Sequence, residues 1–143
     1  MAVEKIKYDS SWSDITPTGL NGLANNSSVN TNAIDNTSNQ VLDYEFEYGY
    51  KYDTNPTANN TIELTIEFSS DGTNWTDKDN YSQNIILTAD TSNHRKRFSV
   101  TEIVSSANYS PSYFRIKITN KGGVAFGSSG NYLKIRKVWR EIV

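Results

Sequence analysis

Hydrophobic and polar residues alternate strictly over residues 62–69. Apolar side chains occupy every second position, and Glu, Thr or Ser fills the positions between them. A period of two puts the apolar side chains on one face of an extended strand and the polar ones on the other. Ser70-Asp71-Gly72 then predicts a tight turn, because glycine adopts a positive φ without steric cost. The pattern predicts a half-buried antiparallel strand that leads into a turn.

A second alternating row, which is mostly aromatic, extends over residues 41–52. The opposite face of this predicted strand carries charged residues and Gly49, and the glycine indicates a bulge or bend. Either the row is the inner face of a sheet, or its end emerges as an exposed platform for sugar stacking or a protein interface. The sequence alone does not decide between them: the platform would be formed by Tyr48, Tyr50 and Tyr52. The whole row comprises Leu42, Tyr44, Phe46, Tyr48, Tyr50 and Tyr52.

Shorter strands are predicted at 85–87, 94–104, 113–119, 124–126 and 132–139, separated by turns rich in Asn, Ser, Gly and Asp. Many short strands without a convincing helix are typical of two packed sheets. We therefore predict an all-β fold: a single antiparallel β-sandwich, jelly-roll or immunoglobulin-like, with about seven or eight strands. The sandwich domain is expected at 17–143.

Residues 1–16 are predicted to form an N-terminal arm or edge strand. Ile6, Tyr8 and Trp12 lie there among polar residues. Terminal segments are poorly ordered unless something holds them, so an apolar arm is a candidate for packing on a neighbouring protein.

The charge of the chain is divided unevenly between its two parts. Residues 1–90 hold 14 acidic and 4 basic residues, whereas residues 91–143 hold 2 and 10, within a total net charge of −2. We expect acidic strands to lie beside basic ones and form cross-strand pairs; a basic docking patch is the alternative. The charged residues after Met1 predict no secretory signal, and no apolar run predicts a membrane span.

Histidine and cysteine chemistry has little material in this chain. His94 is the only histidine and cysteine is absent, which leaves no Cys/His zinc site and no disulfide. Asp71, Asp77 and Asp79 around Asn74 could offer oxygens to calcium, but the segment matches a hairpin turn as well. We predict no metal and no cofactor.

Four glutamates are candidates for the paired carboxylates of glycoside hydrolysis. Their alternation with core residues places them instead on a solvated sheet face, within reach of Lys and Arg from later strands. These glutamates are Glu45, Glu47, Glu63 and Glu67. We therefore predict that the chain is not an enzyme.

Three motifs resemble a family of small bacteriophage virion proteins: AIDNTSN at 33–39, SSDGTNW at 69–75 and TNKGGVAFGSSGNYLKIRKV at 119–138. In outline the family reads LANxSxV, AIDNTSN, an alternating strand, DGTNW or similar, and TNKxGVAxxxSGNxLK. The resemblance covers most of the chain from Leu23 onward, and the segment up to Pro17 matches less well. It implies a β-sandwich subunit of the virus particle, commonly a capsid decoration (cement, auxiliary) protein or a related head or tail component.

The leading hypothesis is a virion structural protein, assembled in the host cytoplasm, that binds the major capsid protein, other virion proteins or further copies of itself. The second hypothesis is a carbohydrate-binding module that uses Trp75, Tyr81 or Tyr50. The third, a nucleic-acid-binding protein, uses a basic set that we do not expect to act in this way: Arg95, Lys96, Arg97, Arg136, Lys137 and Arg140. The candidate partner-binding residues are Ile6, Tyr8, Trp12, Tyr48, Tyr50, Trp75 and Trp139.

Overall fold

The computed structural model describes residues 3–37, 43–75, 81–100 and 112–142. Sheet A contains β1 (Glu4–Tyr8), β2 (Ser13–Asp14), β5 (Asp43–Tyr50), β8 (His94–Ser99) and β10 (Tyr132–Ile142). Sheet B contains β3 (Ser28–Asn30), β4 (Ile34–Asp35), β6 (Thr61–Ser69), β7 (Tyr81–Ile86) and β9 (Tyr113–Lys121). All pairings between these described strands are antiparallel, which confirms the prediction of an all-β, antiparallel fold.

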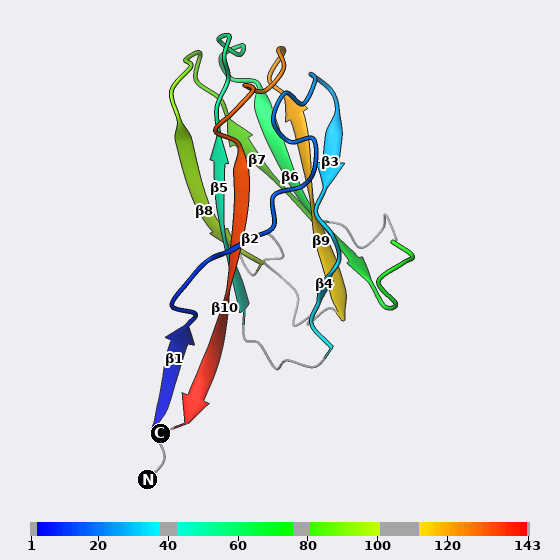
Figure 1. The fold of residues 1–143 in the computed structure, drawn as a ribbon, viewed down its shortest axis with the longest axis vertical. Coiled ribbons are helices and arrows are strands. Elements are labelled where there is room, and N and C mark those ends of the chain that lie inside the picture. Colours follow the sequence, from blue (N-terminus) through cyan, green and yellow to red (C-terminus); the bar gives the residue numbers. More distant parts are fainter. Residues whose placement is uncertain (1–2, 38–42, 76–80, 101–111, 143) are drawn as a thin grey trace.

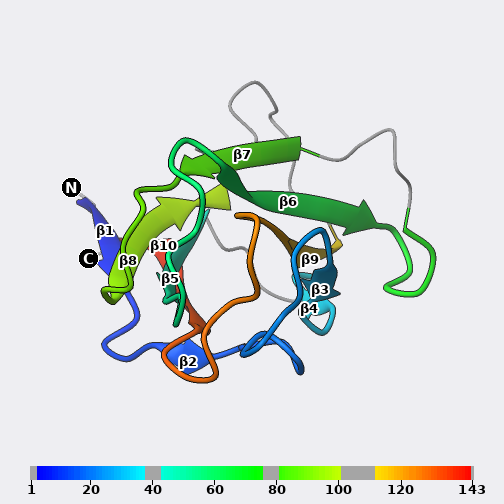
Figure 2. The same cartoon turned by 90° about the horizontal axis from the view of Figure 1, so that it is seen from above.

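Successive parts of the chain contribute strands to the two sheets in turn. Sheet A has the order β1-β10-β5-β8, with β2 also paired to β10, and sheet B has the order β3-β9-β6-β7, with β4 also paired to β9. Figure 1 shows the strands running along the long axis of the molecule. Viewed from above, in Figure 2, they curl around a common interior.

The alternating aromatic row of β5 lies in this interior. Tyr44, Phe46, Tyr48 and Tyr50 are buried, as is Tyr52 just after the strand. The ring of Phe46 stacks on Phe98 of the neighbouring strand β8, with 5.0 Å between centroids, and meets Phe114 of sheet B edge-on at 6.3 Å. The aromatic residues of the row are therefore core residues and do not form an exposed platform. Leu42, the first residue of the row, lies outside the described residues.

The outer faces carry the charge pairs that the uneven distribution predicts. Glu45 pairs in register with Arg136, and Glu47 with Arg97. The closest nitrogen–oxygen distances in these two pairs are 2.8 Å and 3.2 Å. In sheet B, Glu67 contacts its register partner Arg115 at 3.0 Å. Acidic strands from the first part of the chain thus lie beside basic strands from the second part.

Two of these glutamates are more enclosed than the alternation indicates. Glu47 and Glu67 are each only 6% exposed, although they lie on outer faces. Long arginine side chains from the next strand cover them, because an arginine can lay its apolar stem along a sheet while its head group pairs with the carboxylate. The expectation of a fully solvated face is wrong at these two positions.

Buried asparagines join the loops at the upper end of Figure 1. The amide of Asn120, which is 0% exposed, donates to the carbonyl oxygens of Leu23 at 3.0 Å and Val124 at 2.8 Å. Its Oδ1 accepts hydrogen bonds from the Tyr52 hydroxyl at 2.8 Å and the Gly122 N–H at 3.0 Å. One side chain thus satisfies groups from three separate segments of the chain.

Asn131 has a similar role on the next loop. Its Oδ1 accepts the Lys51 N–H at 3.0 Å, and its amide donates to the Gly127 carbonyl at 3.1 Å and to Oδ1 of Asn21 at 3.0 Å. Asn120 and Asn131 both belong to the closing motif at 119–138. The motif that carries the resemblance therefore acts here by holding loops together.

Some local predictions differ from the structure. Gly49 is not at a bulge, since it pairs in continuous register with Tyr132 and Arg95. Residues 124–126 form no strand, and Ile86 at the end of β7 is exposed rather than buried. The predicted strand at 94–104 is a strand from His94 to Ser99, and residues 101–104 lie outside the described part of the chain.

The core tyrosines differ in how their hydroxyls are used. The Tyr52 hydroxyl donates to Asn120, whereas the Tyr48 hydroxyl is fully buried and has no hydrogen-bond partner among the described residues. Burial raises the pKa of both phenols, and it raises the pKa of Tyr44 to about 12. All three hydroxyls therefore remain protonated donors near neutral pH.

We predict different effects on the free energy of unfolding when the hydroxyl of Tyr52 or that of Tyr48 is removed. Tyr52→Phe should lower the free energy of unfolding by about 1–2 kcal/mol, because Asn120 loses a buried hydrogen bond. Tyr48→Phe should leave that free energy unchanged or raise it, because it removes a desolvated hydroxyl without a partner. Urea denaturation of both variants measures the difference, and equal destabilisation by the two changes would contradict this assignment.

Candidate partner-binding surface

The N-terminal segment forms a ribbon with the end of β10. β1 pairs with residues 138–142, and the last pair between β10 and β5 is Val138 with Asp43. This projecting ribbon, β1 together with residues 138–142, extends beyond the other strands at the lower end of Figure 1. Ile6 and Tyr8 are 61% and 51% exposed on it. The ribbon therefore presents large apolar side chains on an edge strand.

Arginines and aromatic rings stack on the outer face of sheet A, beside the ribbon. The guanidinium of Arg136 lies over the rings of both Trp12 and Tyr8, at 4.4 Å and 4.8 Å from their centroids. Arg97 approaches the same tryptophan at 5.5 Å. Glu45 accepts hydrogen bonds from Nε and Nη2 of Arg136, at 3.1 Å and 2.8 Å. We call these five residues the arginine cluster; it attaches the start of the chain to β5, β8 and β10 through cation–π contacts and ion pairs.

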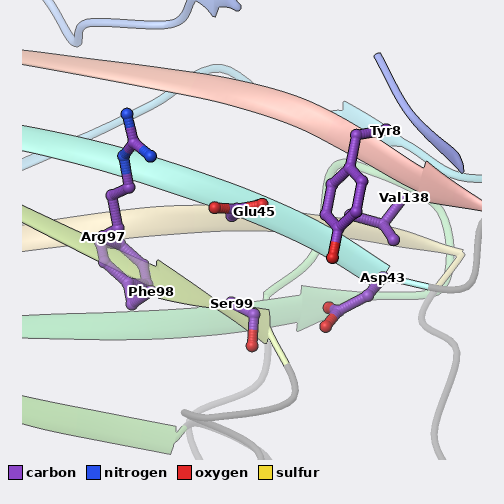
Figure 3. A pocket seen from close by; sticks show the side chains of 7 residues that line it. All are labelled: Tyr8, Asp43, Glu45, Arg97, Phe98, Ser99 and Val138. Atoms are coloured by element: carbon purple, nitrogen blue, oxygen red, sulfur yellow. The ribbon is translucent and has the colours of Figure 1, made fainter. Parts of the chain in front are cut away.

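A cavity of about 330 Å³ adjoins the arginine cluster at the base of the ribbon. Figure 3 shows Tyr8 and Arg97 on opposite sides of it, with Glu45 between them and the Tyr8 hydroxyl directed toward the Asp43 carboxylate. The full lining is Tyr8, Asp43, Glu45, Arg97, Phe98, Ser99 and Val138. The cavity thus combines an aromatic ring with carboxylate, guanidinium and hydroxyl groups.

The structure divides the candidate residues predicted from the sequence. Ile6, Tyr8 and Trp12 come together around the ribbon and the arginine cluster, and Trp139 lies on the other face of the ribbon, where Lys7 approaches its ring at 5.9 Å. Tyr48 and Tyr50 are 0% and 8% exposed and are core residues. They are not available to a partner in the folded chain.

The tryptophan of the SSDGTNW motif lies apart from this surface. Trp75 is half-buried next to sheet B, with the Arg115 guanidinium 4.3 Å from its ring centroid. The carboxylate of Asp71 accepts backbone hydrogen bonds from Thr73 and Asn74, both at 2.8 Å, and these bonds hold its pKa below the usual range. Asp71 therefore closes its own turn; Asp77 and Asp79 lie outside the described residues.

Several of the basic residues are paired with carboxylates. Arg95 and Arg97 approach Glu47, and Arg136 pairs with Glu45. His94 stacks on Tyr50, with 5.0 Å between ring centroids, and its Nε2 lies 2.7 Å from Oδ1 of Asp90. Within the described ranges, no group of three or more His, Cys, Asp or Glu side chains could hold a metal ion, and no helix is long and apolar enough to cross a membrane.

Tyr132, which the sequence did not point to, lies beside Glu47 on the outer face of sheet A. Its ring covers Gly49 on the neighbouring strand, and a Cβ at Gly49 would collide with the ring atom Cε1. Its hydroxyl donates to Oε2 of Glu47 at 3.2 Å, and burial together with the charge of Glu47 raises the pKa of the phenol. The signal was a glycine within an aromatic strand, but only the cross-strand register identifies the ring that covers it.

Comparisons with known proteins find structural similarity without a family match. No family model and no curated protein matches the chain. Among solved structures, the chain is similar to the enzymatically active domain of tailspike protein 4 of bacteriophage CBA120, with a TM-score of 0.39 and 10% identity. The match covers 100% of this chain but only 19% of that one. At this TM-score and identity the match carries no argument about the origin or role of the chain.

The same match corrects one prediction. The matched domain is described as enzymatically active, which contradicts the expectation that the present chain is not an enzyme. We withdraw that expectation. A match of this TM-score and identity assigns neither an activity nor a substrate to the chain.

We predict a strong coupling between Gly49 and Tyr132. Gly49→Ala should lower the free energy of unfolding by about 1–3 kcal/mol, because the new methyl group is forced into the ring of Tyr132. In a Tyr132→Ala background the same change should cost less than about 0.5 kcal/mol, as expected at an ordinary surface position. A double-mutant cycle by urea denaturation measures the coupling. Additive effects would show that the ring does not lie over the glycine.

Proposed function

We propose that the chain is a structural protein of a bacteriophage virion, most specifically a capsid decoration subunit, which binds another virion protein through the projecting ribbon. The observation that carries this proposal is the exposure of Ile6 and Tyr8 on an edge strand that extends from the body of the protein. Exposed apolar groups on a projecting edge favour contact with another protein. Many copies on a repeating particle surface would strengthen a modest contact through avidity.

The placement of the virion-family motifs supports this proposal. Asn120 and Asn131 of the closing motif hold loops together, and Asp71 of the SSDGTNW motif closes its own turn. These residues specify a scaffold and leave the ribbon as a separate element for binding. The segment up to Pro17, which contains β1, matches the family less well, so the case for a contact there rests on its exposed side chains and not on the resemblance.

We further propose that the two sheets form a jelly-roll β-sandwich. Counting β1 with β2 and β3 with β4 as interrupted strands gives eight, of which sheet A holds numbers 1-8-3-6 and sheet B numbers 2-7-4-5 in spatial order. A wound order of this kind supports two intertwined Greek keys, which define a jelly roll. An immunoglobulin-like arrangement, the other predicted class, has a different strand order.

The ribbon should be necessary for attachment to particles. Changing Ile6 and Tyr8 together to Ser should reduce binding at least about tenfold, because the main exposed apolar contact is lost. Ile86→Ser is the matched control, since Ile86 is 69% exposed but lies on β7 of sheet B. Co-sedimentation with particles purified without this subunit measures the effect. Full binding by the double variant, or by a chain that lacks residues 1–16, would contradict the proposal.

Carbohydrate binding is a second candidate, favoured by the cavity between Tyr8 and Arg97. Carboxylate and guanidinium groups can bind sugar hydroxyls there, and the half-exposed Tyr8 ring can cover an apolar sugar face. This places the candidate site away from Tyr50, which is buried, and from Tyr81, which packs on Phe68 at 5.8 Å. The cavity replaces the platform that the sequence indicated.

A glycan array tests this second candidate. Reproducible binding to a glycan should be lost in Tyr8→Ala and kept in Trp75→Ala, because only Tyr8 lines the cavity. A circular dichroism spectrum of each variant checks that the fold is kept. The opposite pattern would locate the sugar site at Trp75, and an array with no reproducible signal would reject carbohydrate binding.

A further inference from the structure

The backbone of β1 faces two directions in alternation. The N–H of Asp9 donates to the carbonyl oxygen of Lys137 at 3.1 Å, while Tyr8 pairs in register with Val138. In an antiparallel ladder, residues that exchange hydrogen bonds alternate with residues whose N–H and C=O point away from the partner strand. Lys5 and Lys7 therefore direct these groups toward β10, and Ile6 and Tyr8 direct theirs outward.

The outward side of β1 is an edge of sheet A. β1 lies at the end of the strand order, and no strand in the described part of the chain pairs with its outer side. Figure 1 shows β1 beside β10 on the projecting ribbon, away from sheet B. Such an edge offers a ready-made template for one more strand, because its outward N–H and C=O groups match the hydrogen-bonding pattern of an extended chain.

The side chains of β1 give the edge a definite chemistry. Ile6 and Tyr8 lie on one face of the ribbon and are 61% and 51% exposed. Lys5 and Lys7, which are also exposed, lie on the other face. An added strand would thus place every second side chain along Glu4, Ile6 and Tyr8. The alternate side chains would lie beside Lys5 and Lys7, of which Lys5 already lies opposite Glu141 of β10.

A second copy of this chain fits the edge poorly. Two β1 strands related by a twofold axis pair antiparallel, and a register centred on Ile6 places Lys5 of one copy opposite Lys7 of the other. Registers centred on Lys5 or Lys7 place a lysine opposite the same lysine. A register centred on Tyr8 places Lys7 opposite Asp9, but it pairs β1 with residues beyond the end of the strand. Like charges directly opposite each other destabilise a strand pair. The complementary occupant is an acidic segment.

We propose that β1 accepts an extended segment of another virion protein as an additional strand. The segment alternates apolar residues, packed on Ile6 and Tyr8, with acidic residues beside Lys5 and Lys7. Main-chain hydrogen bonds to Ile6 and Tyr8 provide affinity, and the two rows of side chains provide specificity. This inference rests on the proposed function and specifies how the projecting ribbon binds its partner.

A pair of synthetic peptides tests the inference on the full chain. An acetylated octapeptide of alternating Val and Glu should bind at least about tenfold more tightly than one of alternating Val and Lys, because only the first pairs with the lysines. Nuclear magnetic resonance titration of ¹⁵N-labelled protein measures both affinities. The amide hydrogens of Ile6 and Tyr8 should gain protection from exchange on binding, whereas that of Lys7, which already faces β10, should change little. Absence of saturable binding, or equal binding of the two peptides, would overturn the inference.

A proline substitution separates the backbone contribution from the side chain. Ile6→Pro removes the outward N–H without removing a hydrogen bond to β10, and edge strands tolerate proline at such positions. It should weaken binding of the Val/Glu peptide at least about tenfold relative to Ile6→Thr, which keeps the N–H and a β-branched side chain. Equal binding by the two variants would overturn strand addition. Self-association of the native chain that Ile6→Pro removes in sedimentation would identify a second copy as the added strand and overturn the proposed acidic partner.

The experiments distinguish failure of the proposed virion contact from failure of strand addition at β1. Particle binding that depends on Ile6 and Tyr8 but is unaffected by Ile6→Pro would keep the proposed function and overturn strand addition. Peptide binding with the expected pattern, but without any attachment of the native chain to particles, would support the edge as a strand acceptor and overturn the virion contact.

Discussion

The fold depends on the mutual burial of aromatic and aliphatic rows from two sheets. Phe46 is central to this arrangement, because its ring contacts Phe98 within sheet A and Phe114 across the interior in sheet B. Neither sheet could bury its apolar face alone, and no cysteine is present to cross-link the chain. The aromatic rings suit this task, since each covers a large area and packs edge-on as readily as stacked.

The outer faces are organised by a different constraint. Glu47 and Glu67 are almost enclosed, and a charge in that position is tolerated only when it is paired and hydrogen-bonded. Arg97 and Arg115 supply these partners from the neighbouring strands. The uneven distribution of charge along the sequence therefore becomes local neutrality in the folded protein. This leaves the ribbon, with its exposed Ile6 and Tyr8, as the chemically distinct part of the surface.

The roles of the motif residues separate scaffold from function. Asn120 and Asn131 connect loops through buried hydrogen bonds, and such networks help to specify a single arrangement of the chain. The proposed contact instead uses the segment before Pro17, where the resemblance to virion proteins is weaker.

The sequence by itself determined the extended segments β5 and β6 and which of their side chains share a face, because the period of two in these segments is a local property of the chain. It also indicated cross-strand charge pairing and the apolar character of the segment with Ile6, Tyr8 and Trp12. It could not decide whether Tyr48 and Tyr50 are core or surface, which depends on what the opposite sheet covers. Tertiary structure alone placed Tyr132 over Gly49, Arg136 between Tyr8 and Trp12, and the N–H groups of Ile6 and Tyr8 on an outer edge. Each of these depends on the register between strands that are distant in the chain, and side-chain alternation within one strand carries no information about which strand lies beside it.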